Sequence, residues 1–340
     1  MTTNKQIDIK NIFSSNTNNL LHEFSHIISN FSKINIKEIG PTIKNMDQYI
    51  FKGDLNIVID ELVNLIFSEL NKGEDAKIIK QRVFDYINDH MIALQQIYIW
   101  LLNNQNNSNS ICMLGYFKYH GIETDINKQK AIELYRKASG LENYVAQLIL
   151  INEHIYGKGF KKNYYLTFEL SKKLAEEHAC GMNILGHCYE SGIGTNIDEE
   201  KAFEFYQKAA DLGNFNALSN LGWCYYGGIG TDIKEEKSFE LYQKAADLGS
   251  SNGISNLGWC YYEGIGTDVD RQKAFELYQK AANLENNGAQ CRLALMYEIG
   301  DGIKKDVDQA IYWYKRAATQ GNLTAQKKLD VLLKIKFVDQ

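Results

Sequence analysis

The chain has 340 residues, of which 44% are hydrophobic and 23% are charged, a composition typical of globular proteins that excludes collagen-like, disordered and miniature disulfide-rich classes. The 37 basic and 42 acidic residues give a formal net charge of -5 without a basic block, so we expect no nucleic-acid partner. A single proline, Pro41, against 26 glycines favours helices joined by glycine turns. These observations predict an all-α fold.

Three features of the sequence bear on the compartment in which the protein is located. Residues 1–19 lack the basic and apolar regions of a secretory signal peptide. The longest apolar-rich stretch, Met91 to Leu102, is shorter than the roughly 20 residues of a membrane-spanning helix. The six cysteines show no short paired spacings that would indicate a disulfide framework. We therefore expect a cytoplasmic protein with free thiols and no membrane insertion.

Residues 1–105 do not repeat and are predicted to form an N-terminal helical segment. Helical periodicity covers Leu20 to Phe31, Ile57 to Leu70 and Ala76 to Leu102, with breaks at Gly40-Pro41 and at Lys72-Gly73-Glu74. The asparagine-rich run from Asn103 to Ser110 is expected to join this segment to the rest of the chain.

The first of these helices contains one catalytic motif. His22, Glu23 and His26 match H-E-x-x-H, which on a helix places two imidazoles on one face for zinc and a carboxylate beside them. A catalytic zinc needs a third protein ligand and a walled cleft, and the surrounding sequence shows neither; Ser29 stands where the longer motif has glycine. We expect a chance spacing on a solvent-facing helix and keep a zinc hydrolase as a remote alternative.

From Ser110 onward the chain repeats itself. Residues 217–249 recur almost letter for letter 36 residues later, and weaker copies lie on both sides. The repeat region, 110–340, divides into six units and a terminal helix: about 110–142, 145–178, 180–213, 217–249, 253–285, 289–321 and 325–336.

Each unit is predicted to be a helix, a glycine turn and a second helix. Ala217, Leu221, Cys224 and Tyr225 fall on one stripe of a helix, and Ser238, Leu241, Tyr242, Ala245 and Ala246 do the same for the next. Between them, Gly228 and Gly230 can adopt positive φ. One helix pair cannot bury its apolar faces alone, so consecutive units must stack into a solenoid.

The residue that opens each second helix supports these boundaries. Five of the six side chains can accept hydrogen bonds from the first backbone N–H groups of a helix, and the sixth is a lysine. The six residues are Asn127, Asn163, Asp198, Lys234, Asp270 and Asp306. We interpret them as helix caps rather than as a site.

The repeat resembles the Sel1-like repeat, a relative of the tetratricopeptide repeat. The pattern A-x-x-x-L-G-x-x-Y-x-x-G-x-G followed by D-x-x-K-A-x-x-x-Y-x-K-A-A-x-x-G covers about residues 110–335, with Ala294 in place of the glycine after leucine in the last unit. In the fourth unit it is matched by Ala217, Leu221, Gly222, Tyr225, Gly228, Gly230, Lys237, Tyr242, Lys244, Ala245, Ala246 and Gly249. The resemblance implies a right-handed α/α superhelix of about six 36-residue repeats that acts as an adaptor or scaffold, as in ER-associated degradation ligases and fungal chitin synthase regulators.

The N-terminal segment adds a second resemblance. The stretches Glu61 to Gly73 and Trp100 to Ser110 resemble the leader of expanded sets of fungal Sel1-like proteins, in which a kinase domain is often fused to the repeats. Kinase motifs are absent from this sequence, so this resemblance implies at most a protein that works beside a kinase.

The first helices of the repeats carry the candidate binding residues. Large aromatic side chains recur on the face opposite the core stripe, and such residues anchor protein interfaces at low entropic cost. The candidates are Tyr116, Tyr119, His187, Glu190, Ser219, Trp223, Tyr226, Ser255, Trp259, Tyr262, Leu295 and Glu298. First helices line the concave side of such arrays, so we expect these residues to hold a protein or peptide. The alternative is that Trp223 and Trp259 pack into neighbouring repeats or against the N-terminal segment.

The remaining motifs do not indicate chemistry. The recurring Gly-Ile-Gly-Thr turns lack the lysine and the preceding strand of a phosphate-binding loop, and the other histidines lack ligand spacing. We expect no cofactor, metal or catalytic residue. The sequence thus predicts a non-enzymatic adaptor in signalling or complex assembly, the alternative being a regulatory subunit acting in trans on a kinase, a chitin synthase or a ubiquitin-ligase complex. Oligomeric state and partner identity are left open.

Overall fold

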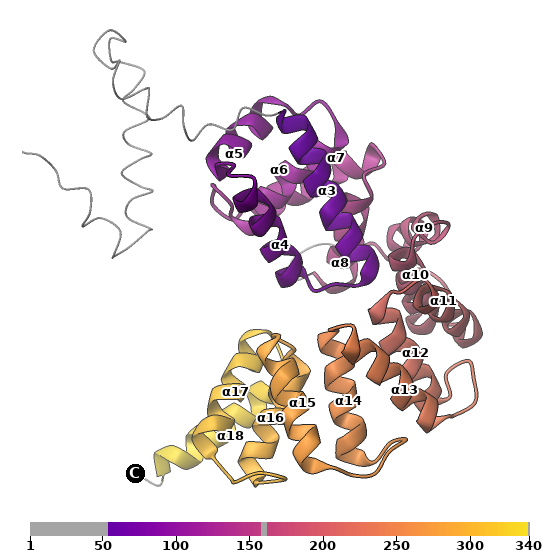
Figure 1. Cartoon of the computed structure of the whole chain (residues 1–340), viewed down its shortest axis with the longest axis vertical. Helices are drawn as coiled ribbons and strands as arrows, with labels where there is room; N and C mark the ends of the chain where they lie inside the picture. Colours follow the sequence, from indigo (N-terminus) through magenta and orange to yellow (C-terminus); the bar gives the residue numbers. More distant parts are fainter. Residues whose placement is uncertain (1–53, 158–161, 339–340) are drawn as a thin grey trace, which may run out of the picture. The chain divides into compact units, whose positions relative to one another are not determined.

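The computed structural model describes residues 54–157 and 162–338, with side chains described as far as residue 334. These residues form sixteen helices, and the described part contains no strand (Figure 1). The predicted helix from Leu20 to Phe31, with its H-E-x-x-H motif, lies outside the described residues. None of the described helices is long and apolar enough to cross a bilayer.

Helices α6 to α17 form six consecutive pairs, as the six predicted units require. The bounds are α6 (Ser108–His120), α7 (Lys128–Gly140), α8 (Tyr144–Tyr156), α9 (Tyr164–Ala175), α10 (Ala179–Ser191), α11 (Glu199–Asp211), α12 (Phe215–Gly227), α13 (Glu235–Asp247), α14 (Ser251–Glu263), α15 (Arg271–Asn283), α16 (Asn287–Ile299) and α17 (Val307–Thr319). A last helix, α18 (Leu323–Val338), packs on α17. Each helix contacts the next along the chain, so the array is an all-α solenoid.

The predicted caps of the second helices are confirmed. The side-chain oxygen of the cap accepts the backbone N–H three residues later at 2.9 to 3.0 Å in five units. Lys234, the exception in the sequence pattern, makes no side-chain cap bond.

The glycine turns pack one unit against the unit before it. Gly228 ends α12 with φ 69°, and Gly230 has φ 63°, as predicted. A Cβ atom on Gly230 would collide with the carbonyl oxygen of Glu199 at the start of α11 in the preceding unit. The glycine therefore permits a close approach of two backbones.

A buried tyrosine joins the two helices within a pair. Tyr206 and Tyr242 are at most 1% exposed, and a Cβ atom on Gly186 or Gly222 would lie 2.8 Å from their rings. In α6, α10, α12 and α14, the Leu-Gly motif of the first helix is thus the place where the tyrosine ring of the second helix packs. The recurring thiols of the first helices are buried on the same side, and all six cysteines are free.

The N-terminal helices differ from the prediction in one respect. The predicted stretch from Ala76 to Leu102 is broken into α4 (Ala76–Asp89) and α5 (Leu94–Asn103). Met91 takes a left-handed conformation with φ 52°, and the N–H of Ile92 bonds back to the Ile87 carbonyl at 3.0 Å. This turn buries Ile92, whose burial stabilises a break that helical periodicity alone does not show.

Helix α3 (Leu55–Lys72) and helices α4 and α5 share a hydrophobic core with the first repeats. Ile59 and Leu62 from α3 and Leu101 from α5 are at most 1% exposed and belong to the same cluster as Phe117 of α6 and Tyr135 of α7. Asn107 caps α6 by accepting the N–H of Ser110 at 2.8 Å, so the asparagine-rich run is partly helix. The described N-terminal helices therefore cover the first repeats instead of forming a separate core.

Candidate functional site

The predicted candidates fall into two columns along the first helices. One repeat position is occupied by Tyr116, His187, Trp223, Trp259 and Leu295, and a second position, three residues later in each helix, by Tyr119, Glu190, Tyr226, Tyr262 and Glu298. Within each column, the exposed fraction of the side chain differs from unit to unit.

Three aromatic residues of α12 and α14 form one cluster, which we call the aromatic shelf: Trp223, Tyr226 and Trp259. The ring centroid of Trp259 lies 4.6 Å from that of Tyr226 and 6.2 Å from that of Trp223. The Arg292 guanidinium lies 5.9 Å from the Trp259 ring. Trp223 remains 45% exposed. The indoles thus pack across neighbouring repeats and still present apolar surface to solvent.

Three other candidates lie inside the protein. Tyr116, Ser219 and Ser255 are only 4%, 5% and 8% exposed. The Ser219 hydroxyl donates to the Phe215 carbonyl one turn earlier, at 3.3 Å. The expectation that these side chains are displayed to solvent is therefore corrected, because all three are buried in the packing of the array.

The glutamates of the second column bond to the second helix of their own unit. Glu190 accepts the Tyr206 hydroxyl at 2.6 Å, with His187 Nδ1 at 3.7 Å, and these contacts hold the pKa of Glu190 below its usual value, His187 contributing most. Glu298 accepts the Tyr314 hydroxyl at 2.7 Å and pairs with Lys328 at 3.1 Å. Both carboxylates have structural partners.

The remaining tyrosines and the leucine are half-buried. The Tyr119 hydroxyl donates to Glu153 at 2.5 Å, and the Tyr262 hydroxyl donates to Asp301 at 2.7 Å. The Arg271 guanidinium covers the Tyr262 ring at 3.7 Å from its centroid. Leu295 is partly exposed on α16. Apart from the aromatic shelf and Leu295, the predicted columns are therefore held in place by internal contacts.

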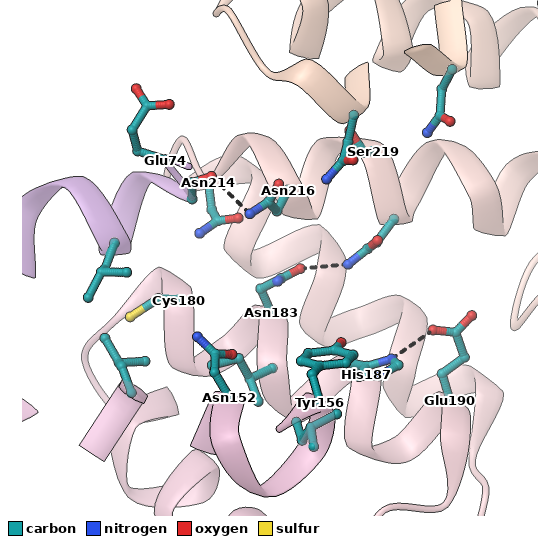
Figure 2. Close-up of a pocket in the computed structure, with 18 residues that line it drawn as sticks. Glu74, Asn152, Tyr156, Cys180, Asn183, His187, Glu190, Asn214, Asn216 and Ser219 are labelled. Carbon is teal, nitrogen blue, oxygen red and sulfur yellow. Dashed lines mark hydrogen bonds and ion pairs between the residues drawn. The ribbon is translucent and has the colours of Figure 1, made fainter. Parts of the chain in front are cut away.

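A polar cavity of about 490 Å³ lies along the first helices (Figure 2). Residues of α3, α8, α10, α12 and α14 line it, among them His187, Glu190 and Ser219 of the predicted set. Its most frequent residue is asparagine, which the sequence reasoning did not single out. We call the six asparagines that line the cavity from the first helices the asparagine row: Asn152, Asn183, Asn216, Asn220, Asn252 and Asn256.

The carboxamides of the asparagine row are only partly used. Asn220 donates to the Asn183 carboxamide oxygen at 2.9 Å, and Asn252 accepts from Asn286 at 2.8 Å. Asn152 and Asn256 have no hydrogen-bond partner among residues 54–157 and 162–338. Free donors and acceptors therefore face the cavity.

The turn between α3 and α4 lies at one side of the same cavity. Asn214 and Asn216 of the array donate their side-chain amides to the main-chain carbonyls of Asn71 and Gly73, each at 2.9 Å. The Asn71 side chain accepts the Cys180 N–H at 3.0 Å. Gly73 has φ 89°, and a Cβ atom there would lie 2.9 Å from the Asn216 amide. The sequence indicated a break at Lys72-Gly73-Glu74 but gave no sign of what it contacts.

Comparison with known proteins places these observations in a family. The Sel1 repeat model matches residues 108–143, 181–214, 216–250, 251–286 and 288–322, more than half of the chain, and leaves out the α8–α9 pair. A Sel1 repeat protein from Oxalobacter formigenes is 24% identical with a TM-score of 0.54, over 71% of this chain and 94% of that one. This likeness shows that the two chains share the same fold.

Two further solved structures are more distant in shape. The Escherichia coli protective antigen c5321, which displays an SLR fold, is 26% identical with a TM-score of 0.48 over 72% of this chain; this chain spans about half of its length, 52%. The Pseudomonas aeruginosa immunity protein Pa5087 is 19% identical with a TM-score of 0.44, over 68% of this chain and 82% of that one. No curated protein matches. With its five matched repeats, the chain belongs to the Sel1 repeat family.

Proposed function

We propose that this protein is a non-catalytic adaptor that holds a protein partner on the face formed by its first helices, in the cytoplasm, in signalling or complex assembly. The single observation that carries the proposal is the aromatic shelf, where Trp223 is 45% exposed although it lies against Trp259 and Tyr226. Tryptophan and tyrosine are the residues most enriched among the energetic anchors of protein interfaces.

The buried thiols favour an adaptor over an enzyme that uses cysteine. Burial raises the pKa of Cys224 to about 12 and that of Cys260 to about 12. The reactive form of cysteine is the thiolate, which is scarcely present at neutral pH with such pKa values. These side chains serve the core.

The test is a pull-down from cell lysate with quantitative mass spectrometry. The wild type is compared with a Trp223→Ala/Trp259→Ala variant and with Tyr165→Ala, a matched control that removes a 71% exposed aromatic from the second helix α9. Circular dichroism checks that all three are folded. We expect specific proteins bound by the wild type and the control and lost from the double variant.

An unchanged set of bound proteins would overturn the proposal, since the indoles would then be packing residues only. If the captured partner is an enzyme whose turnover changes on adding the wild type, the adaptor acts as a regulatory subunit. The zinc hydrolase hypothesis has a separate test, because His22, Glu23 and His26 lie outside the described residues. Stoichiometric zinc that is lost in His22→Ala would support it.

A further inference from the structure

The array already binds a main chain in its asparagine-lined cavity. The side-chain amides of Asn214 and Asn216 donate to the carbonyls of Asn71 and Gly73, two residues apart in the α3–α4 turn. A carboxamide carries one acceptor oxygen and a donor NH₂ group, which together match the C=O and N–H of a peptide unit. The contact with this turn is therefore an internal example of backbone recognition by asparagine.

The same chemistry continues along the cavity beyond this turn. Asn152 on α8 and Asn256 on α14 have no partner within the described ranges, and the Asn183–Asn220 bond leaves an NH₂ group on Asn183 and an oxygen on Asn220 without one. Figure 2 shows Asn152, Asn183 and Asn216 projecting into one space. Their groups are available to pair with the main chain of a ligand.

The spacing of the asparagine row suits an extended ligand. The row is carried by four first helices, α8, α10, α12 and α14. Packed helices lie about 9 Å apart, so four of them span about 30 Å. An extended chain rises about 3.3 Å per residue, so about nine residues cover that distance. A helical ligand would not use the carboxamides in this way, because its backbone groups are bonded internally.

The charge of the cavity lining and the apolar surface beside it indicate which side chains the ligand carries. Glu190 contributes a carboxylate to the cavity, Glu74 contributes a second one that is paired with Arg82 at 3.2 Å, and the described lining contains no lysine or arginine. An acidic segment is disfavoured there by like charge. The aromatic shelf follows directly on the row, because Trp223 and Trp259 lie three residues, or about one helical turn, after Asn220 and Asn256.

We propose that the asparagine row binds the main chain of an extended, neutral or basic segment of another protein, about nine residues long, with an apolar side chain placed on the aromatic shelf. This inference rests on the proposed function and specifies the kind of partner. Sequence specificity comes from the shelf and from charge, whereas the carboxamides recognise any main chain of suitable conformation.

The experiment uses the full chain and a displayed library of random peptides about nine residues long. The best selected peptide is titrated against the wild type, Asn152→Ala/Asn256→Ala and Asn283→Ala. Asn152 and Asn256 are chosen because they have no partner among the described residues, so their loss leaves internal bonds intact. Asn283 is an exposed asparagine on the second helix α15 and serves as the matched control.

We expect the double variant to bind about tenfold more weakly, since two hydrogen bonds are lost, and the control to bind like the wild type. Methylation of single main-chain nitrogens of the peptide is expected to weaken binding at alternate positions, and acidic substitutions are expected to weaken it throughout.

Equal affinity for the wild type and the double variant, together with tolerance of every main-chain methyl group, would overturn the inference. So would a library that yields no binder while the lysate partner is still captured, because the partner would then be recognised by a folded surface. The proposed function would survive both results. It fails instead if the Trp223→Ala/Trp259→Ala variant keeps its partner.

Discussion

The hydroxyl of Tyr206 donates a hydrogen bond to Glu190 across 2.6 Å and so joins α11 to α10 from inside the unit. Tyr314 and Glu298 make the same contact at 2.7 Å in the last unit. In the two units between them, Tyr226 and Tyr262 occupy the position of the glutamate. The same repeat position thus carries an internal carboxylate anchor in two units and a half-buried aromatic side chain in the two units between them.

Replacing Glu190 by alanine is expected to destabilise the protein by about 1 to 3 kcal/mol, because the hydroxyl of Tyr206, a residue only 1% exposed, loses its acceptor. Urea unfolding followed by circular dichroism measures the change. Glu204→Ala removes an exposed glutamate from the neighbouring helix α11 and is expected to change the free energy of unfolding by less than about 0.5 kcal/mol. Equal effects of the two substitutions would contradict the anchor role.

The same carboxylate predicts a pH dependence. Bonding to His187 and Tyr206 lowers the pKa of Glu190 below its ordinary value of 4.5. A group whose pKa is lower in the folded state contributes stability that is complete above the unfolded-state pKa and is lost as the pH falls through the folded-state value. Wild type and Glu190→Gln should therefore differ in urea midpoint at neutral pH and converge as the pH falls below 4.5. A gap that stays constant with pH would argue against this assignment.

Gly222 is expected to tolerate no side chain. A Cβ atom there would lie 2.8 Å from the Tyr242 ring, so Gly222→Ala should destabilise the protein by about 1 to 3 kcal/mol through overpacking. Ala294 occupies the same repeat position in the last unit, which already accommodates the methyl group. For Ala294→Gly we expect a smaller loss of about 0.5 to 1 kcal/mol from backbone entropy. Thermal unfolding tests whether Gly222→Ala lowers the unfolding temperature more than Ala294→Gly does. A larger decrease for Ala294→Gly would contradict the argument from tyrosine packing.

Removal of the last unit together with α18 tests whether each unit contributes separately to the free energy of unfolding. A chain that ends at Glu285 loses α16 to α18 and exposes Tyr278 and Ala282, which are buried in the full chain. Because stability in a repeat array is close to a sum over units and their interfaces, we expect helical circular dichroism to persist with a lower unfolding temperature. A truncated chain without helical signal would show that the array folds only as a whole.

Local features were predictable because they depend on residues close in sequence. The cap of a second helix needs only a side chain and an N–H three residues later, as Asp198 and Lys201 show. The break at Met91 was missed for a related reason. A left-handed residue without glycine leaves no mark in the sequence, and the burial of Ile92 that stabilises it is tertiary.

The candidate site was predictable in part. The recurrence of Trp223 and Trp259 indicated a face, and the structure places both in one cluster. Ser219 is a predicted site residue, whereas Asn220, one residue and about 100° further around the helix, lines the cavity more openly. The recurrence of asparagine at Asn220 and Asn256 was the signal available. Its meaning depends on the bond from Asn216 to the backbone of Gly73, a partner 143 residues away.

The docked turn also has a consequence for the order of folding. Units that touch only their neighbours close short loops, whereas the bonds from Asn214 to Asn71 and from Lys77 to Glu285 close loops of 143 and 208 residues. Contacts of such long sequence separation form late, because the entropy of the connecting chain must first be given up. The repeats can therefore assemble along the chain before the α3–α4 turn docks. A chain with unstacked inner units has no surface to receive that turn, so docking follows the stacking of the units that contact it.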